Sequence, residues 1–270
     1  MIYLDTSEIM KIGLKLAGWK KIPHDSTIHL EGKNISKILL TIDVTVSELL
    51  LAKELDCDCV IGHHPIGITH INFSRVFNRH LDYMLEHGIS RKKAKILVGS
   101  LVERVNIRTH SSIYNQVIDA AKLLNLPLVN IHQPLDEYMR QIIYNKISQS
   151  KPKKIQDIIN ILDDIPEFHN AATKIIVPYG NIDNNVDKWA LVIAAGTNGG
   201  YQIAKAYFEH GISTVIYLHI DYSDLLKLRE SKSTGNLVVL GHLAGDSIGI
   251  NGLSSELIKR GVEVVKLGIL

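Results

Sequence analysis

Short apolar runs alternate along the chain with segments whose apolar residues recur every three or four positions. The runs predict buried strands, and the spaced segments predict helices. In the first part of the chain, strands are expected at residues 37–44, 58–62 and 127–131. Thr45 with Glu48 three residues later is a capping-box sequence, which predicts a helix directly after the first strand. A strand, a helix and a second strand in so short a segment form a βαβ unit, so the sheet should be mainly parallel.

The same pattern suggests how the chain divides into domains. Residues 73–125 have helical spacing throughout, whereas residues 150–154 are polar, basic and interrupted by proline, as is typical of a linker. Beyond the linker, strands are expected at 173–177, 189–195, 214–218, 237–240 and 262–267, and helices at 199–209, 222–230 and 247–260. The fold class should be α/β, with two α/β domains that have mainly parallel or mixed sheets and helices on the faces. We expect a first domain at 1–150 with the helical insert and a second α/β region at 151–270, of which 236–270 packs back on the first.

Composition excludes several classes of protein. The chain has 270 residues, of which 46% are hydrophobic and 21% charged, as in ordinary globular proteins. Its 30 basic and 28 acidic residues nearly cancel, so charge favours neither nucleic acid nor a membrane as partner. Cys57 and Cys59 are too few for a disulfide framework and are expected as buried small hydrophobes. With neither a signal-peptide pattern nor an apolar stretch near the roughly 18 residues of a membrane span, a cytoplasmic protein is expected.

Three clusters of histidine and acid stand where a predicted strand should end: Gly62-His63-His64-Pro65, His132 to Asp136, and His242 to Asp246. Each cluster taken alone is more often a structural turn. Together they offer imidazoles and carboxylates, the mixed nitrogen and oxygen ligands that suit Zn, Fe, Mn or Ni. Ligands of open α/β sheets bind at the carboxyl ends of the strands. The shared placement therefore predicts a metal site.

The spacing within the clusters allows one metal or two. Adjacent strand residues face opposite ways, so His63 and His64 share a site only if the strand ends there, as Pro65 favours. Alternatively, each histidine binds a different metal of a pair. In the other two clusters a histidine and an aspartate are four residues apart, about one helical turn. Carboxylates from two segments can bridge two metals, as in two-metal hydrolytic sites.

Other residues offer weaker chemistry. His219 follows a predicted strand and precedes Asp221, so it is a base, an additional ligand or a plain loop residue. Residues 196–200, Gly-Thr-Asn-Gly-Gly, precede a predicted helix and form a candidate phosphate-binding turn. They lack both the P-loop lysine and the full dinucleotide spacing, so the signal is weak. The remaining histidines singled out are expected at the surface or at helix ends: His70, His80, His87, His169 and His210.

The three motifs, with Asp43 at the end of a strand ahead of them, resemble the Nif-three-like dinuclear metal-centre family. Members of this family are often labelled GTP cyclohydrolase I type 2. The resemblance covers residues 6–265 and implies two α/β domains, two divalent metal ions and a ring-shaped homohexamer. Carried over residue by residue, it implies these metal ligands: His63, His64, Asp136, His242 and Asp246.

The resemblance also implies a function. His132 would lie in or beside the ligand set, and His132 or His219 would be the catalytic proton shuttle. We expect a metal-dependent hydrolase in which a dinuclear centre activates water against a nucleotide or related heterocycle. The alternatives are a non-enzymatic, metal-containing ring that binds partners and an ordinary nucleotide-binding α/β protein. The late acid is usually glutamate in the family, and the stretch from His64 to His132 is usually shorter, so this insert is expected to cover the site.

Overall fold

The structure is a computed structural model that describes residues 4–194 and 196–270. It contains two compact units, each built from segments that are distant in sequence. Unit 1 comprises the described residues as far as Val76, together with Val105–Tyr138 and Asp246–Ile269. Unit 2 comprises Phe77–Arg104, Met139–Gly245 and Leu270.

The sheet of unit 1 has five strands. Their order is β1 (Thr27–Leu30), β4 (Leu128–Asn130), β3 (Cys59–Gly62), β2 (Lys37–Thr41) and β9 (Glu263–Leu267). β1 pairs antiparallel with β4, and the other neighbours pair parallel. The carboxyl ends of β2, β3 and β4 therefore meet at one edge of the sheet, and the residues that follow these strands are brought together there.

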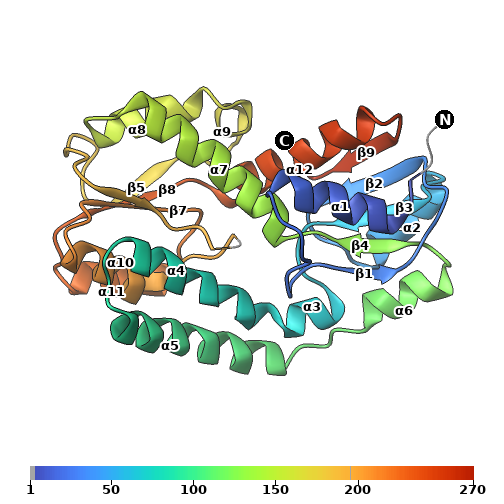
Figure 1. The fold of residues 1–270 in the computed structure, drawn as a ribbon, viewed down its shortest axis with the longest axis horizontal. Helices are drawn as coiled ribbons and strands as arrows, with labels where there is room; N and C mark the ends of the chain where they lie inside the picture. The colour runs from blue at the N-terminus through green and yellow to red at the C-terminus, as the bar shows by residue number, and fades with distance from the viewer. Residues whose placement is uncertain (1–3, 195) are drawn as a thin grey trace. The chain divides into compact units, whose positions relative to one another are not determined.

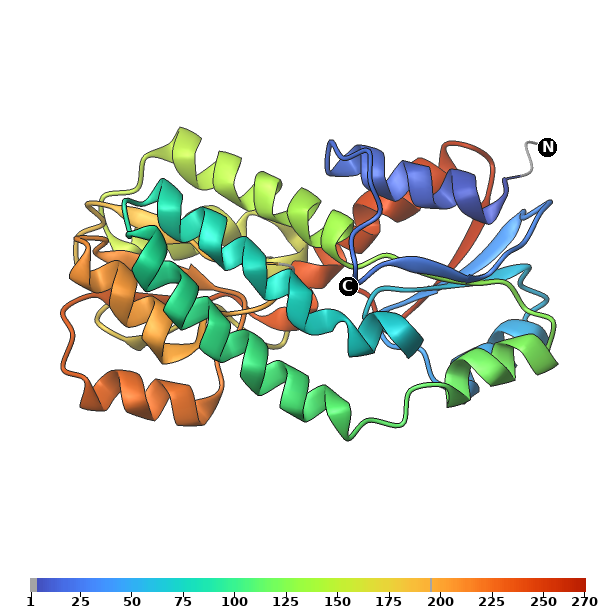
Figure 2. The same ribbon diagram turned by 60° about the horizontal axis from the view of Figure 1, so that its bottom comes forward.

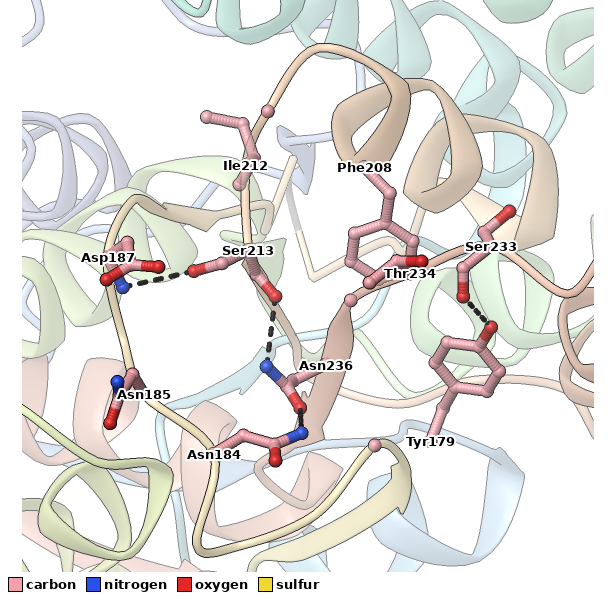
Figure 3. A pocket seen from close by; sticks show the side chains of 13 residues that line it. Tyr179, Asn184, Asn185, Asp187, Phe208, Ile212, Ser213, Ser233, Thr234 and Asn236 are labelled. Carbon is pink, nitrogen blue, oxygen red and sulfur yellow. Dashed lines mark hydrogen bonds between the residues drawn. The ribbon is translucent and has the colours of Figure 1, made fainter.

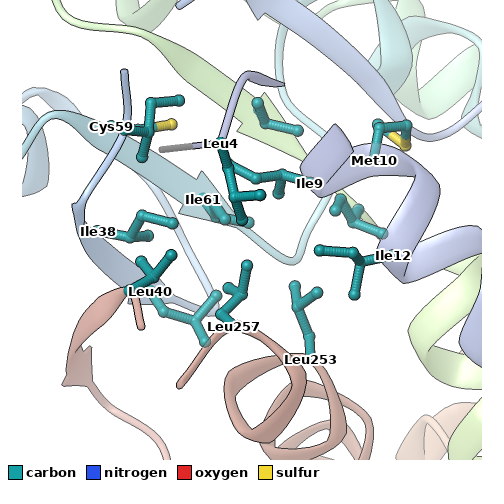
Figure 4. Packing of buried hydrophobic residues seen from close by; sticks show 14 of the residues in the cluster. Leu4, Ile9, Met10, Ile12, Ile38, Leu40, Cys59, Ile61, Leu253 and Leu257 are labelled. Carbon is teal, nitrogen blue, oxygen red and sulfur yellow. The ribbon is translucent and has the colours of Figure 1, made fainter. Parts of the chain in front are cut away.

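Helices cover both faces of this sheet (Figure 1). α1 (Thr6–Leu16) and α12 (His242–Ile258) supply one hydrophobic cluster, and α2 (Val46–Glu54) and α6 (Gln116–Leu123) supply the other. Figure 4 shows Ile38 and Leu40 of β2 in the first cluster. Leu39 belongs to the second, as the two-residue repeat of a strand requires. The capping box that begins α2 is present, with both Thr45 and Glu48 in their expected roles.

The sheet of unit 2 has four strands. Their order is β5 (Ile176–Tyr179), β8 (Asn236–Val239), β7 (Thr214–Tyr217) and β6 (Trp189–Leu191), with β5 antiparallel and the rest parallel. In Figures 1 and 2, α10 (Gly200–Glu209) and α11 (Tyr222–Glu230) lie together beside this sheet, and α8 (Ile155–Asp163) lies on its other side. The remaining helices that reach into unit 2 are α4 (Arg79–Glu86), α5 (Arg91–His110), α7 (Gln133–Ser150) and α9 (Pro166–Asn170).

The predicted α/β fold class is confirmed, with mostly parallel strands in both sheets. The pattern did not predict β1, α8, α9 or the five-residue α3 (Gly67–Ile71). α12 begins at His242 rather than at residue 247, although Gly245 and Gly249 weaken helical propensity. A Cβ on Gly249 would lie 2.5 Å from the carbonyl oxygen of Leu135, so tertiary packing requires glycine there and overrides propensity.

Among the residues that the structure describes, we find no helix that is both long enough and apolar enough to cross a membrane.

Candidate metal centre

Both adjacent histidines after β3 lie in the same cluster of side chains. The backbone N–H groups of His63 and His64 both donate to the carbonyl oxygen of Ile42, just beyond the end of β2. The strand pairing ends at this point, and the two ring centroids lie 5.4 Å apart. His63 is buried, whereas the His64 side chain is 26% exposed. The expectation that the strand gives way at these residues is confirmed.

A third imidazole comes from the end of β4. The ring of His132 lies 4.8 Å from that of His63 and 5.8 Å from that of His64, measured between centroids. One ring nitrogen of each of the three lies within 4.8 Å of those of the other two, which is close enough to hold a metal ion. His132 thus lies inside the candidate ligand set rather than at its margin.

Each imidazole is oriented by an oxygen atom outside the cluster. The Nδ1 atoms bond to acceptors at 2.7–3.0 Å: Ile131 O for His63, Asp43 Oδ1 for His64, and Asp25 Oδ2 for His132. A carbonyl or carboxylate oxygen only accepts, so Nδ1 must be the donor in each bond. The Nε2 lone pairs are therefore left to face one another, as in metal sites whose histidines are held by oxygen acceptors.

Asp136 supplies the carboxylate that most strongly favours a bound cation in the cluster. It lies in the first turn of α7, and its side chain is 1% exposed. Its Oδ1 is 3.3 Å from His63 Nε2, and its Oδ2 is 3.4 Å from His132 Nε2. Neither oxygen, nor His63 Nε2, has a hydrogen-bond partner among the described residues. Buried polar atoms left in this way are costly, and a cation coordinated by them would remove the cost.

Asp246 of α12 supplies the second carboxylate. Its Oδ2 is 3.2 Å from His64 Nε2, and its Oδ1 is 3.8 Å from His63 Nε2. The Asp246 side chain is 2% exposed, so the four acid–imidazole approaches of the cluster all involve a buried carboxylate. His63, Asp136 and Asp246 form a second group whose ligand atoms lie within metal-binding distance of one another. The donor set therefore fits a divalent metal.

The two carboxylates control the charge of the histidines. Burial alone would lower the pKa of His63, but the negative charges of Asp136 and Asp246 raise it above its usual value. Burial also opposes protonation of His64, yet hydrogen bonds to Asp246 and Asp43 raise its pKa to about 10. The cluster therefore attracts a cation strongly, and protons and metal ions compete for the same nitrogen atoms.

Two further predicted residues lie in unit 2. His219 follows β7, and His242 follows β8 and begins α12 one turn before Asp246. The rings of His219 and His242 are 4.7 Å apart. Both residues thus lie at the carboxyl edge of the unit 2 sheet, where α/β proteins bind ligands.

Sequence reasoning missed Asp25, which is fully buried and holds His132. It precedes β1, a strand that the pattern did not predict. The neighbouring Ser26 Oγ accepts a hydrogen bond from the backbone N–H of His132, and Asn130 Nδ2 donates to the carbonyl oxygen of Asp25. The local signal was an acid two residues before a short strand, which is common in loops.

A large cavity of about 740 Å³ lies elsewhere in unit 2, at the amino ends of β7 and β8 (Figure 3). Two of its carboxamides are already hydrogen-bonded: Asn184 Nδ2 donates to Asn236 Oδ1, and Asn236 Nδ2 donates to the carbonyl oxygen of Ser213. No imidazole is among its lining residues. The histidine–aspartate cluster thus lies at the carboxyl ends of strands and not in this cavity.

Fold and site together define an α/β protein with a buried histidine–aspartate cluster that is compatible with a metal site. The family model described as Duf34/NIF3 (NGG1p interacting factor 3) matches residues 27–91, which include His63 and His64. A solved structure, the NIF3 superfamily protein from Sphaerobacter thermophilus, is 41% identical, with 100% of both chains covered and a TM-score of 0.96. The chain belongs to the NIF3 superfamily.

More distant structures share the fold alone. Reduced HcgD from Methanocaldococcus jannaschii is 13% identical, with 99% of both chains covered and a TM-score of 0.57. TTHA1606 from Thermus thermophilus is also 13% identical, with 98% of both chains covered and a TM-score of 0.55. Comparison with curated proteins gave no match.

Proposed function

We propose that this protein is a metal-dependent hydrolase with a dinuclear metal centre. The observation that carries the proposal is Asp136, a buried carboxylate with each oxygen directed at a different imidazole and neither hydrogen-bonded within the described chain. A carboxylate whose two oxygens face different imidazoles can bridge two ions, one at each oxygen, as in two-metal hydrolytic sites.

The ligand set follows from the same distances. Asp136 spans His63 and His132, and Asp246 spans His63 and His64, so each carboxylate is placed to bridge. We therefore assign His132 to the ligands, held by Asp25, rather than to proton transfer. We retain His242 as a further ligand because it lies one helical turn from Asp246 and matches the family motif. Zn, Fe, Mn and Ni all suit this set of nitrogen and oxygen donors.

The side chains of the protein would hold the metal ions and orient the imidazoles around them. Bound divalent metals supply Lewis acidity and lower the pKa of water towards neutrality. Asp43 and Asp25 keep His64 and His132 in the tautomer that leaves Nε2 for metal. His64 is the most exposed of the three clustered imidazoles, so the substrate would approach from its side. A nucleotide or related heterocycle is the substrate class that the family resemblance implies.

The test combines metal analysis with turnover. The purified full-length protein should contain close to two equivalents of metal by elemental analysis, and the loaded protein should hydrolyse GTP or another member of a nucleotide panel. Asp136→Asn should lose both metal and turnover. Asp163→Asn is the matched control, because it alters an exposed Asp–His pair with a separation of 3.2 Å. Full metal occupancy without turnover of any nucleotide would refute the hydrolase.

Burial of the site favours one second function, a metal-containing ring that binds partners without catalysis. His63 and Asp136 are only 1% exposed, and closed sites are typical of structural metals. In that case metal removal should lower the thermal stability and dissociate a hexamer in sedimentation experiments, while no substrate is turned over.

A further inference from the structure

The glycine-rich segment at residues 196–200 in unit 2 has a different role from the phosphate binding that its sequence suggests. The backbone N–H of Gly200, at the start of α10, donates to Asn198 Oδ1 at 2.8 Å. A phosphate at this helix end would need that N–H group. The chain itself therefore occupies the position, and the turn holds a carboxamide instead.

The turn is held rigidly on both sides of Asn198. The hydroxyl of Thr197 donates to the carbonyl oxygen of Ala194, and it accepts a hydrogen bond from His80 Nε2 at 3.1 Å. His80 is fully buried. A Cβ on Gly199 would lie 2.5 Å from Ile203, so only glycine fits there. The surroundings thus fix the orientation of the Asn198 side chain, and with it the side-chain atom that faces His219.

That orientation determines where the hydrogen of His219 lies. Because Asn198 Oδ1 accepts from Gly200, the other side-chain atom, Nδ2, must be the one that faces His219 Nδ1, at 3.2 Å. An amide NH₂ group only donates, so Nδ1 of His219 is the acceptor. The ring hydrogen is then on Nε2, a tautomer assigned here from the hydrogen-bond network.

We propose that Asn198 is a positioning residue that keeps the hydrogen of His219 on Nε2, so that His219 donates a hydrogen bond to bound substrate. This role rests on the proposed hydrolase. A nitrogen that carries hydrogen has no lone pair with which to take a proton from water or bind a metal. His219 is therefore neither the base nor an additional ligand.

The donor also defines a feature of the substrate. His219 follows β7 and stacks with His242 after β8, at the edge of the sheet where α/β proteins bind ligands. A fixed N–H group stabilises an oxygen or ring nitrogen on which negative charge develops during the reaction. The substrate should therefore present such an acceptor atom, as a purine carbonyl or ring nitrogen does.

Nuclear magnetic resonance of the zinc-loaded full chain, labelled with ¹⁵N-histidine, tests the tautomer without any activity. His87 and His210 are internal references, since their Nδ1 atoms donate to backbone carbonyl oxygens at 2.8 Å. Each should show the hydrogen on Nδ1, and His219, assigned by its loss in His219→Gln, should show it on Nε2. A spectrum in which His219 resembles His87 would overturn the proposal.

Substitution of Asn198 should move the hydrogen. In Asn198→Asp a carboxylate still accepts from Gly200, but its second oxygen can only accept, so the hydrogen of His219 should shift to Nδ1. Asn185→Asp, an exposed change in the same unit, should leave the His219 signal in place. An unchanged His219 tautomer in Asn198→Asp would also overturn the assignment.

Kinetics separate the donor role from mere packing. In His219→Gln the amide nitrogen lies near the original Nε2 position, so kcat should stay within about tenfold of wild type, whereas His219→Asn and Asn198→Asp should lose about 10²–10³-fold. Metal content should be equal in all four proteins. Equal losses in the Gln and Asn variants would overturn the donor role. If the wild type turns over no nucleotide, the hydrolase proposal fails, while the spectra still decide the tautomer.

Discussion

Removing metal should destabilise unit 1 through Asp136 and His63. The three atoms concerned are His63 Nε2, Asp136 Oδ1 and Asp136 Oδ2, which are buried without a hydrogen bond inside the described chain. An unsatisfied buried polar group costs roughly 1–3 kcal/mol. Water or altered side-chain positions would recover part of this cost in the metal-free protein. Chelation should therefore lower the free energy of unfolding by several kcal/mol at most.

Mass action gives the size of the measurable shift. A metal at one hundred times its Kd stabilises the folded state by about 2.7 kcal/mol. In a chain of this size, 1 kcal/mol corresponds to roughly 2–4 °C in Tm, so chelation should lower Tm by about 5–11 °C. Thermal unfolding monitored by circular dichroism, with Zn²⁺, with Mn²⁺ and with chelator, measures this shift directly.

Asp136→Asn makes the measurement specific to the site. The amide keeps the shape of the side chain but removes an anionic ligand, so most of the metal-dependent shift in Tm should disappear. Asp163→Asn changes an exposed acid beside His169 and should keep the full shift. The reasoning is refuted if the wild-type Tm is the same with metal and with chelator, or if both variants respond alike.

Three more outcomes are expected, two of them at the site and the third, with its control, at glycines of two helices. In chelator, the stability contributed by protonated His64 is complete below pH 6.5 and is lost as pH rises to about 10, so Tm should fall over that range and His64→Gln should flatten the profile. Asp25→Asn should weaken metal binding about 10–100-fold in a chelator competition assay, and Asp43→Asn, which alters a 75% exposed acid, should weaken it less. Gly249→Ala should destabilise by about 1–3 kcal/mol in urea unfolding, because its Cβ meets backbone. Gly99→Ala, in open space on a helix, should stabilise by about 0.4–1 kcal/mol.

The strands and helices with strong local signals were predictable from sequence. β2, α2 and β3 follow directly from an apolar run, a capping box and a second apolar run. β1 was missed because its four residues are only partly buried and its pairing with β4 is formed by residues about a hundred positions away. The start of α12 was missed because glycine lowers helical propensity locally, while the close approach to Leu135 is visible only in the folded chain.

Some residues of the candidate site were likewise predictable from sequence, and others were not. His63, His64 and His132 were predictable because parallel strands deliver their carboxyl ends to one edge, and the structure brings all three together. Asp25 was not, because its contact with His132 depends on the antiparallel pairing of β1 with β4. The tautomer of His219 was likewise invisible, since it depends on which end of a carboxamide faces the ring.

The close packing of α12 explains how a short acid at position 246 reaches the histidine cluster. The family motif usually has glutamate there, and aspartate is shorter by one methylene group. In unit 1, Gly249 and Gly252 face the first two turns of α7, where a Cβ would come within 2.5 Å of Leu135 O and 2.3 Å of the Tyr138 ring. Two positions without side chains thus bring the α12 backbone close to the turn that holds Asp136. The carboxylate of Asp246 consequently reaches to 3.2 Å from His64 Nε2 without the extra methylene.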